Sequence, residues 1–168
     1  MQKLLTEEQL RSRVKELAEM ISRDYEGKVP IFIGVLNGSF IFLADLIREL
    51  SIECEVDFIK LASYEAGKSI GTVHLLKDIS ADITGRDVII AEDIVDTGLT
   101  ISFLKTRMAD AGPASLKIVT LLFKKEVARL NFDLDYVGFE IPPGFVVGYG
   151  LDYNQKMRNL RAIFTINE

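Results

Sequence analysis

The 168-residue chain has one cysteine, one histidine and no tryptophan. Cys54 alone cannot form an internal disulfide, which fits a reducing compartment. His74 has no second histidine to form a relay, so we expect it to lie on a strand face rather than in a catalytic site. No apolar run reaches the roughly 18 residues of a membrane span, and the first eight residues lack the apolar core of a signal peptide. These absences predict a cytoplasmic protein with no membrane partner.

The composition also limits domain number and partners. A hydrophobic content of 48% over 168 residues predicts one domain with a substantial core. The net charge of −5 argues against a nucleic-acid-binding surface, so we expect no nucleic-acid partner. No repeat, low-complexity tract or linker interrupts the chain.

The most informative stretch is Asp87–Thr100, which reads DVIIAEDIVDTGLT. Its apolar run at 88–91 predicts a buried strand. Glu92 and Asp93 follow where we expect that strand to end, at the edge where open α/β sheets bind ligands. Two adjacent acids at this position indicate a functional site. The alternative is an ordinary strand–turn–helix unit with a solvated acidic loop.

A turn of small polar residues follows the acidic pair. Asp96, Thr97, Gly98 and Thr100 lead into a helix for which we expect an apolar face of Leu99, Phe103, Met108 and Ala111. Backbone N–H groups at a helix start hold phosphate, and threonine hydroxyls add donors. The turn is neither a Walker loop, since it lacks the Gly-Lys-Ser/Thr ending, nor a dinucleotide-binding Gly-x-Gly-x-x-Gly.

The remaining segments predict alternating strands and helices. A capping box of Thr6 and Gln9 begins the first helix. The predicted faces are Leu10, Val14, Leu17, Ala18 and Ile21 for that helix, and Ile41, Ala44, Leu46 and Ile47 for a helix from about 40 to 50. The predicted strands are 31–35, 52–63, 72–76, 115–123, 136–141 and 162–166, whereas 145–154 reads as a glycine-dotted irregular loop. The alternation predicts an α/β fold with a parallel, doubly wound sheet and helices on both faces.

The sequence Glu-Asp-Ile-Val-Asp-Thr-Gly at 92–98 closely resembles the phosphoribosyl pyrophosphate motif of type I phosphoribosyltransferases, in the form of the hypoxanthine-guanine branch. Further motifs agree in order over nearly the whole chain. The resemblance implies a single phosphoribosyltransferase domain over 1–168, with a core of about 1–130. A small hood of about 131–168, joined by the N-terminal segment, and a flexible hairpin loop would complete it.

The resemblance also implies an activity. A purine salvage enzyme would transfer the 5-phosphoribosyl group from phosphoribosyl pyrophosphate to hypoxanthine or guanine, with Mg²⁺ as cofactor and a homodimer or homotetramer as assembly. An RNA-binding regulator, a phosphoribosyl pyrophosphate sensor and the adenine and orotate branches are the alternatives. The sequence leaves open the preferred base, the use of xanthine, the choice of dimer or tetramer and any regulation.

The donor-binding roles follow from the same resemblance. Leu36, Asn37 and Gly38 would form the pyrophosphate turn, whose first peptide is often cis, although a simple connecting turn is the alternative. Arg158 would also contact pyrophosphate. Glu92 and Asp93 would hold the ribose hydroxyls, and residues 96–100 the 5′-phosphate. Asn37 stands where many relatives carry lysine or arginine, and Leu99 stands where some relatives carry a basic residue. These two differences leave the affinity for phosphoribosyl pyrophosphate open.

Residues for the base, the metal and the chemistry complete the implied site. Asp96 would exchange a proton with purine nitrogen-7. Lys124 would contact the 6-oxo group, Phe145 would stack on the purine and Val146 would offer backbone groups, although a solvated strand-end lysine is the alternative for Lys124. Asp152 would bind magnesium, with Glu92 and Asp93 as further candidates through ribose or water. Ser63 and Tyr64 would begin a flexible loop reaching to Gly71 that closes over the site.

Overall fold

The computed structural model describes residues 1–64 and 72–166, and its centre is a six-stranded sheet in the order β4-β3-β2-β5-β6-β7. Neighbouring strands are parallel except for β4, which is antiparallel to β3. The strands are β2 (Ile31–Leu36), β3 (Glu55–Tyr64), β4 (Thr72–Lys77), β5 (Asp87–Val95), β6 (Ser115–Phe123) and β7 (Tyr136–Glu140). The hairpin of β3 and β4 is as predicted, and residues 65–71 of the predicted closing loop lie outside the described residues.

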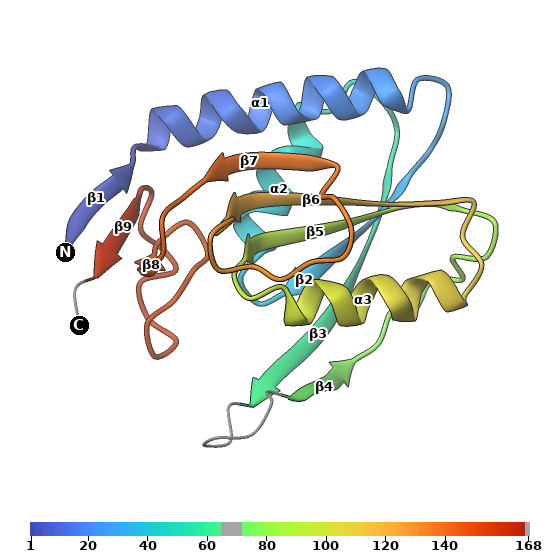
Figure 1. The fold of residues 1–168 in the computed structure, drawn as a ribbon. Helices are drawn as coiled ribbons and strands as arrows, with labels where there is room; N and C mark the ends of the chain where they lie inside the picture. The colour runs from blue at the N-terminus through green and yellow to red at the C-terminus, as the bar shows by residue number, and fades with distance from the viewer. Residues whose placement is uncertain (65–71, 167–168) are drawn as a thin grey trace.

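Helices cover both faces of this sheet (Figure 1). The helices α1 (Glu7–Asp24) and α2 (Phe40–Glu49) pack on one face, and α3 (Leu99–Asp110) packs on the other. Alternate strand residues serve the two cores, with Phe32 packing among α1 and α2 residues and Ile33 among α3 residues. The predicted α/β doubly wound architecture is therefore confirmed.

The start and the buried face of α1 are also as predicted. The Thr6 hydroxyl accepts the Gln9 N–H at 3.1 Å, and the Thr6 N–H donates to the Gln9 side chain at 2.9 Å. The five apolar residues expected on its inner face are all buried. Two reciprocal hydrogen bonds thus cap the N-terminus of α1, and the packing of its apolar face on the sheet stabilises the remaining turns.

The predicted faces of the other two helices are partly wrong. In α3 the buried residues are Ile101, Leu104 and Met108, whereas Leu99 is 38% exposed. In α2 the buried residues are Phe42, Leu43 and Leu46, and Ala44 is exposed. Because α2 has a wide apolar side and α3 has apolar residues on most sides, packing on the sheet rather than periodicity selects the inner face.

The strand β5 continues through the acidic pair to Val95, although we expected it to end before Glu92. Its pairing with β2 stops at Ala91, but its pairing with β6 continues through Glu92 and Ile94. The acids therefore lie on a strand that has a neighbour on one side only. Because β2 no longer pairs with β5 beyond Ala91, the two strands separate at their carboxyl ends.

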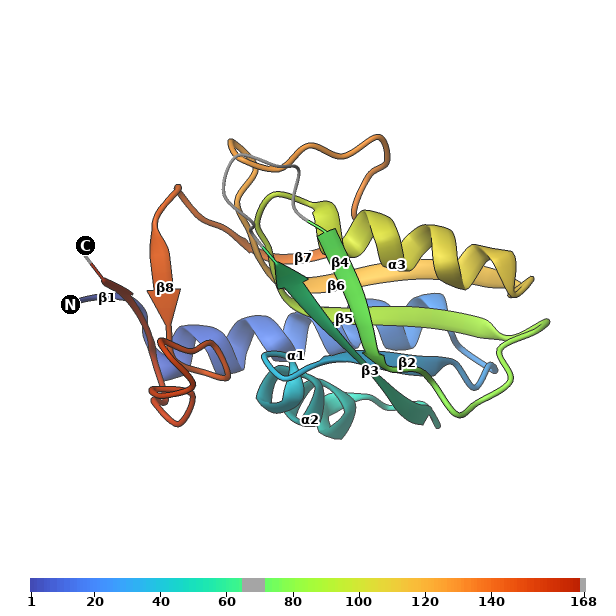
Figure 2. The same ribbon diagram turned by 90° about the horizontal axis from the view of Figure 1, so that it is seen from below.

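A second sheet of three antiparallel strands joins the two ends of the chain. It has the order β1-β9-β8, from β1 (Gln2–Leu5), β9 (Ile163–Ile166) and β8 (Phe145–Val147). Figures 1 and 2 show it beside the carboxyl ends of the main strands, with the first and last described strands, β1 and β9, side by side in it. We refer to this sheet with residues 148–162 as the hood. Neither β1 nor β8 was predicted, because each is too short to show a period and pairs with distant residues.

The strand β7 lies at the edge of the main sheet. It pairs in parallel with β6, starting from Val119 and Tyr136, and so belongs to the main sheet. Arg13 of α1 donates to the carbonyl oxygens of Val137 at 2.9 Å and Gly138 at 2.8 Å, which satisfies acceptors on this edge strand. Among the described residues, no helix is both long and apolar enough to cross a membrane.

Candidate functional site

A cavity of about 900 Å³ lies at the carboxyl ends of β2 and β5. Strand order reverses between these two strands, which is where open α/β sheets bind ligands. The cavity is lined by Val35, residues 36–38, Leu61, residues 92–102, Arg129, Asp152 and Arg158. The structure thus brings together every residue expected at the pyrophosphate, ribose and 5′-phosphate positions.

The turn after β2 packs against the acidic pair. The Leu36–Asn37 peptide is cis, as the resemblance implied. A Cβ atom placed on Gly38 would lie 1.8 Å from a carboxylate oxygen of Asp93. Only glycine therefore allows the turn and this carboxylate to approach each other so closely.

Burial dominates the electrostatics of Glu92 and Asp93. It raises the pKa of Glu92 well above 4.5, and the Asp93 carboxylate adds to that effect. Burial also raises the pKa of Asp93 to about 6, although the Ile94 N–H, 2.8 Å from its Oδ1, acts in the opposite direction. The two carboxylates therefore resist being ionised together, which makes hydroxyl or cationic partners favourable for them.

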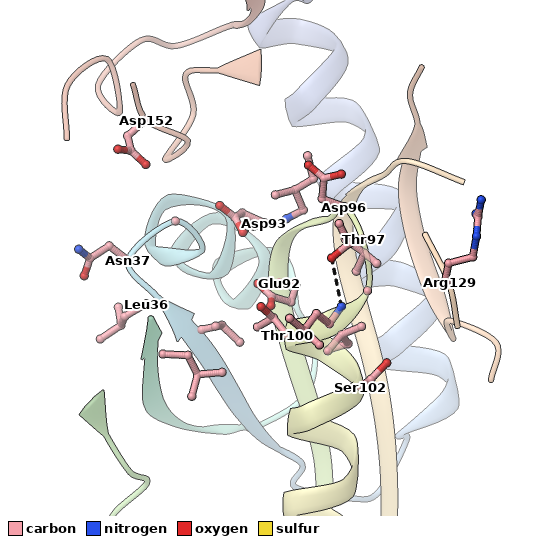
Figure 3. A pocket seen from close by; sticks show the side chains of 18 of the residues that line it. Leu36, Asn37, Glu92, Asp93, Asp96, Thr97, Thr100, Ser102, Arg129 and Asp152 are labelled. Carbon is pink, nitrogen blue, oxygen red and sulfur yellow. Dashed lines mark hydrogen bonds between the residues drawn. The ribbon is translucent and has the colours of Figure 1, made fainter. Parts of the chain in front are cut away.

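The segment 96–100 forms a cradle of backbone N–H groups at the start of α3. Gly98 has φ +92° and stands immediately before the helix, where the Leu99 N–H lies 3.4 Å from the Thr97 hydroxyl (Figure 3). The Arg129 N–H donates to the Thr97 carbonyl oxygen at 2.9 Å. This contact fixes the outer side of the loop. The first N–H groups of α3 have no acceptor within the helix, so they can bind an anion.

Lys124 lies directly behind this loop. It is 7% exposed, and its ammonium donates to Asp96 Oδ2 at 2.6 Å. The alternative of a solvated strand-end lysine is therefore wrong. Lys124 is not among the lining residues of the cavity, but its partner Asp96 is.

Asp152 and Arg158 complete the cavity from the hood. Figure 3 places Asp152 across the cavity from Asn37 and Asp93. Arg158 pairs with Asp152 at 3.1 Å and donates to the Gly150 carbonyl oxygen at 2.8 Å. A carboxylate and a guanidinium from the hood thus face the turn and the acidic pair of the main sheet.

No cluster of three or more histidine, cysteine or acidic side chains is placed to hold a metal in the described part of the chain. Magnesium commonly uses one or two carboxylates together with substrate phosphates and water. Asp152 offers a carboxylate oxygen of the type that magnesium prefers. The available carboxylate oxygens therefore fit a metal ion that binds together with a phosphorylated substrate.

The two hood residues expected to bind the base do not line the cavity. Phe145 is 42% exposed and meets Tyr153 edge to face, with ring centroids 5.8 Å apart. Val146 is buried in β8. Sequence reasoning missed Ser102 and Arg129 as lining residues, because no motif marks them. Ser102 could have been found from its place one turn into α3.

The comparisons with known proteins agree with this geometry. The family model described as "Phosphoribosyl transferase domain" matches residues 2–154, and so the chain belongs to the phosphoribosyltransferase family. The hypoxanthine-guanine phosphoribosyltransferase of Lactococcus lactis is 46% identical over 158 residues, which are 94% of this chain and 86% of the relative. The Mycobacterium tuberculosis enzyme of that name is 43% identical over 98% of this chain and 85% of its own.

Solved structures give the same assignment. A hypoxanthine-guanine phosphoribosyltransferase from Bacillus anthracis superposes with a TM-score of 0.94 at 47% identity, covering 99% of both chains. A hypoxanthine phosphoribosyl transferase of Trypanosoma cruzi superposes with a TM-score of 0.93 at 43% identity, covering 99% of this chain and 91% of the other. The resemblance to the hypoxanthine-guanine branch is therefore confirmed.

Proposed function

We propose that the protein is a purine salvage enzyme of the hypoxanthine-guanine type. It transfers the 5-phosphoribosyl group from phosphoribosyl pyrophosphate to hypoxanthine, guanine or both, and releases pyrophosphate with IMP or GMP. One observation carries the proposal. A single cavity joins the cis peptide turn, the buried acidic pair, the N–H cradle and the Asp152–Arg158 pair, with Asp96 held by a buried lysine.

The donor occupies the cavity along its length. Backbone groups of residues 36–38 and the Arg158 guanidinium bind pyrophosphate, and residues 97–100 bind the 5′-phosphate. Glu92 and Asp93 accept hydrogen bonds from the ribose hydroxyls, which fixes the ring for attack at its anomeric carbon. Asn37 and Leu99 contribute no charge, so backbone donors carry most of the phosphate binding.

The purine lies at the end of the cavity nearest Asp96. Asp96 accepts the proton of nitrogen-7, which makes the base a better nucleophile. Lys124 hydrogen-bonds the 6-oxo group while remaining paired with Asp96. The exposed ring of Phe145 stacks on the purine, and the main chain of Val146 pairs with its edge.

Magnesium is the proposed cofactor, held by Asp152, with Glu92 and Asp93 acting through ribose or water. When bound, it stabilises the negative charge of the departing pyrophosphate. The protein's own residues orient the donor, move the proton and shield the reaction from water. Ser63 and Tyr64, at the end of β3, begin the segment proposed to close over the site; 65–71 lie outside the described residues.

The proposal also covers the domain organisation, the assembly and the cellular compartment of the protein. The chain forms one phosphoribosyltransferase domain of a homo-oligomer, and its substrates are small molecules. Cys54 is half-buried and has no disulfide partner among the described residues, which fits the cytoplasm.

An absorbance assay with the donor, magnesium and a panel of bases tests the proposal. We expect turnover of hypoxanthine or guanine, and a kcat about 10²–10⁴-fold lower for Asp96→Asn, which loses the proton acceptor. Turnover of uracil or orotate alone would contradict the proposed branch. Binding of the donor with no turnover of any base would instead indicate a regulator or sensor.

A further inference from the structure

Tyr149 joins the hood to the helix that follows the pyrophosphate turn. It is 8% exposed and adopts φ +52°, which is unusual for a tyrosine. Its hydroxyl donates to Asp45 Oδ2 of α2 at 2.5 Å. Burial, together with the Asp45 carboxylate, raises the pKa of Tyr149, so the phenol remains a hydrogen-bond donor over the whole physiological range.

The next residue, Gly150, connects the two pyrophosphate-binding segments. A Cβ atom at Gly150 would lie 2.2 Å from the carbonyl oxygen of Gly38, so the two backbones are in direct contact. The Gly150 N–H donates to the Arg158 carbonyl oxygen at 2.9 Å, and its own carbonyl accepts from the Arg158 guanidinium at 2.8 Å. Any displacement of Gly150 therefore moves Arg158 relative to the turn.

The helix α2 is connected both to the pyrophosphate turn and to Tyr149. It continues directly from the turn, since the Phe40 N–H donates to the Asn37 carbonyl oxygen at 3.3 Å and the Leu43 N–H to that of Ser39 at 2.8 Å. Asp45 lies near the middle of the same helix, Phe40–Glu49. The helix thus holds the turn at its start and the hood segment at its middle.

We propose that Tyr149, through Asp45, is a positioning residue that holds Arg158 and Asp152 over the pyrophosphate turn. The proposal rests on the proposed function. The hydroxyl touches no substrate and acts by fixing Gly150 against Gly38. The loss of this one hydrogen bond should weaken binding of the donor and of pyrophosphate without affecting the purine.

Steady-state kinetics on the whole enzyme tests this directly. We expect Tyr149→Phe and Asp45→Ala each to raise the KM for the donor, and for pyrophosphate in the reverse reaction, by about tenfold, as a lost hydrogen bond to a charged group can. The KM for hypoxanthine should stay within about twofold of the wild-type value. The double variant should be no worse than either single variant, because both remove the same bond.

Tyr136→Phe is the matched control. Tyr136 is 5% exposed and also donates to a carboxylate, Asp24 at 2.5 Å, but between α1 and β7, away from the cavity lining. It should lose similar thermal stability and keep its donor KM. Calorimetric titration with the donor should show the same difference in Kd. An unchanged donor KM in Tyr149→Phe, or an equal rise in Tyr136→Phe, would overturn the positioning role. An inactive wild-type protein would contradict the proposed function instead.

Discussion

At the scale of single residues, the proposed contact of Lys124 with the purine predicts a preference for one group at position 6 of the base. Its ammonium has three donors and no acceptor, is 7% exposed and already serves Asp96. A 6-oxo group satisfies a remaining donor, whereas the 6-amino group of adenine leaves a buried charge facing another donor. Sites built to hydrogen-bond one group can reject an analogue that lacks it by roughly 10⁴–10⁵ in kcat/KM.

Lys124→Met should therefore lower kcat/KM for hypoxanthine far more than for adenine. Methionine replaces the aliphatic stem, and the loss of a partner for Asp96 affects both bases alike. The ratio of the two kcat/KM values is thus the measurement that isolates base recognition. A ratio that is the same in both proteins would show that the lysine does not recognise the base.

The buried acidic pair predicts an unusual dependence of stability on pH. Burial raises the Asp93 pKa from 3.8 to about 6, so the folded protein binds more protons than the unfolded one between these values. The free energy of unfolding should therefore fall as the pH rises through this window, and remain lower above it. The Arg107 guanidinium lowers the pKa of Asp78 below 3.8, so stabilisation by that pair is lost only at more acidic pH.

Asp93→Asn should accordingly raise the melting temperature at pH 7.5, with a smaller gain at pH 4.5. The amide oxygen can still accept the Ile94 N–H while the buried charge is removed. For a domain of this size, each kcal/mol recovered corresponds to about 2–4 °C. Calorimetry at the two pH values measures the gain, and equal melting temperatures at pH 7.5 would contradict it. Donor affinity should fall in the same variant, because the ribose loses a charged acceptor.

At the scale of elements, Gly98 sets the backbone conformation of residues 96–100, which we propose bind the 5′-phosphate of the donor. Alanine there would be strained at φ +92°, and its Cβ would lie 2.6 Å from the Leu130 side chain and 3.2 Å from the Arg129 carbonyl oxygen. We expect Gly98→Ala to raise the donor KM at least tenfold, since N–H groups of the cradle would be displaced. The KM for hypoxanthine should change little.

Gly112→Ala provides the control at the other end of α3. It has φ +69° and no atom within 4 Å of a built Cβ, so it carries similar backbone strain without the clash. It should lose stability of the order of 1–2 kcal/mol and keep its donor KM. Steady-state kinetics with calorimetric melting compares the two variants. Equal donor KM values would show that strain alone, and not the position of the cradle, is responsible.

The elements also show how far sequence reasoning reaches. The helix α1 could be predicted in full because its cap is local and its single apolar stripe permits one packing. The inner faces of α2 and α3 could not, because α2 has a wide apolar side and α3 has apolar residues on most sides, so packing on the sheet selects among them. The acidic motif was located correctly, but the extension of β5 depends on pairing with β6, which no local signal encodes.

At the scale of the whole molecule, the site lies between two sheets assembled from distant residues. Gln2 pairs with Thr165, so the hood exists only when both ends of the chain meet. Motif resemblance indicated the lining residues at 36–38, 92–93, 96–100, 152 and 158, because each motif is a short continuous segment, but it missed Ser102 and Arg129. It did not indicate β1, β8 or the exposed position of Phe145, because long-range pairing determines them.

This arrangement places Asp152 of the hood in the lining of the cavity, where we propose that it binds magnesium together with the substrate phosphates. Asp152→Asn should raise the magnesium concentration needed for half-maximal activity, because one carboxylate ligand is lost while phosphate oxygens remain. Higher magnesium should restore much of kcat/KM. Asp93→Asn should be impaired at every magnesium concentration, because its proposed partner is a ribose hydroxyl. Magnesium titrations of both variants at saturating base distinguish the two roles. Rescue of Asp93→Asn but not of Asp152→Asn would reverse the assignment and place the metal on the main sheet instead of the hood.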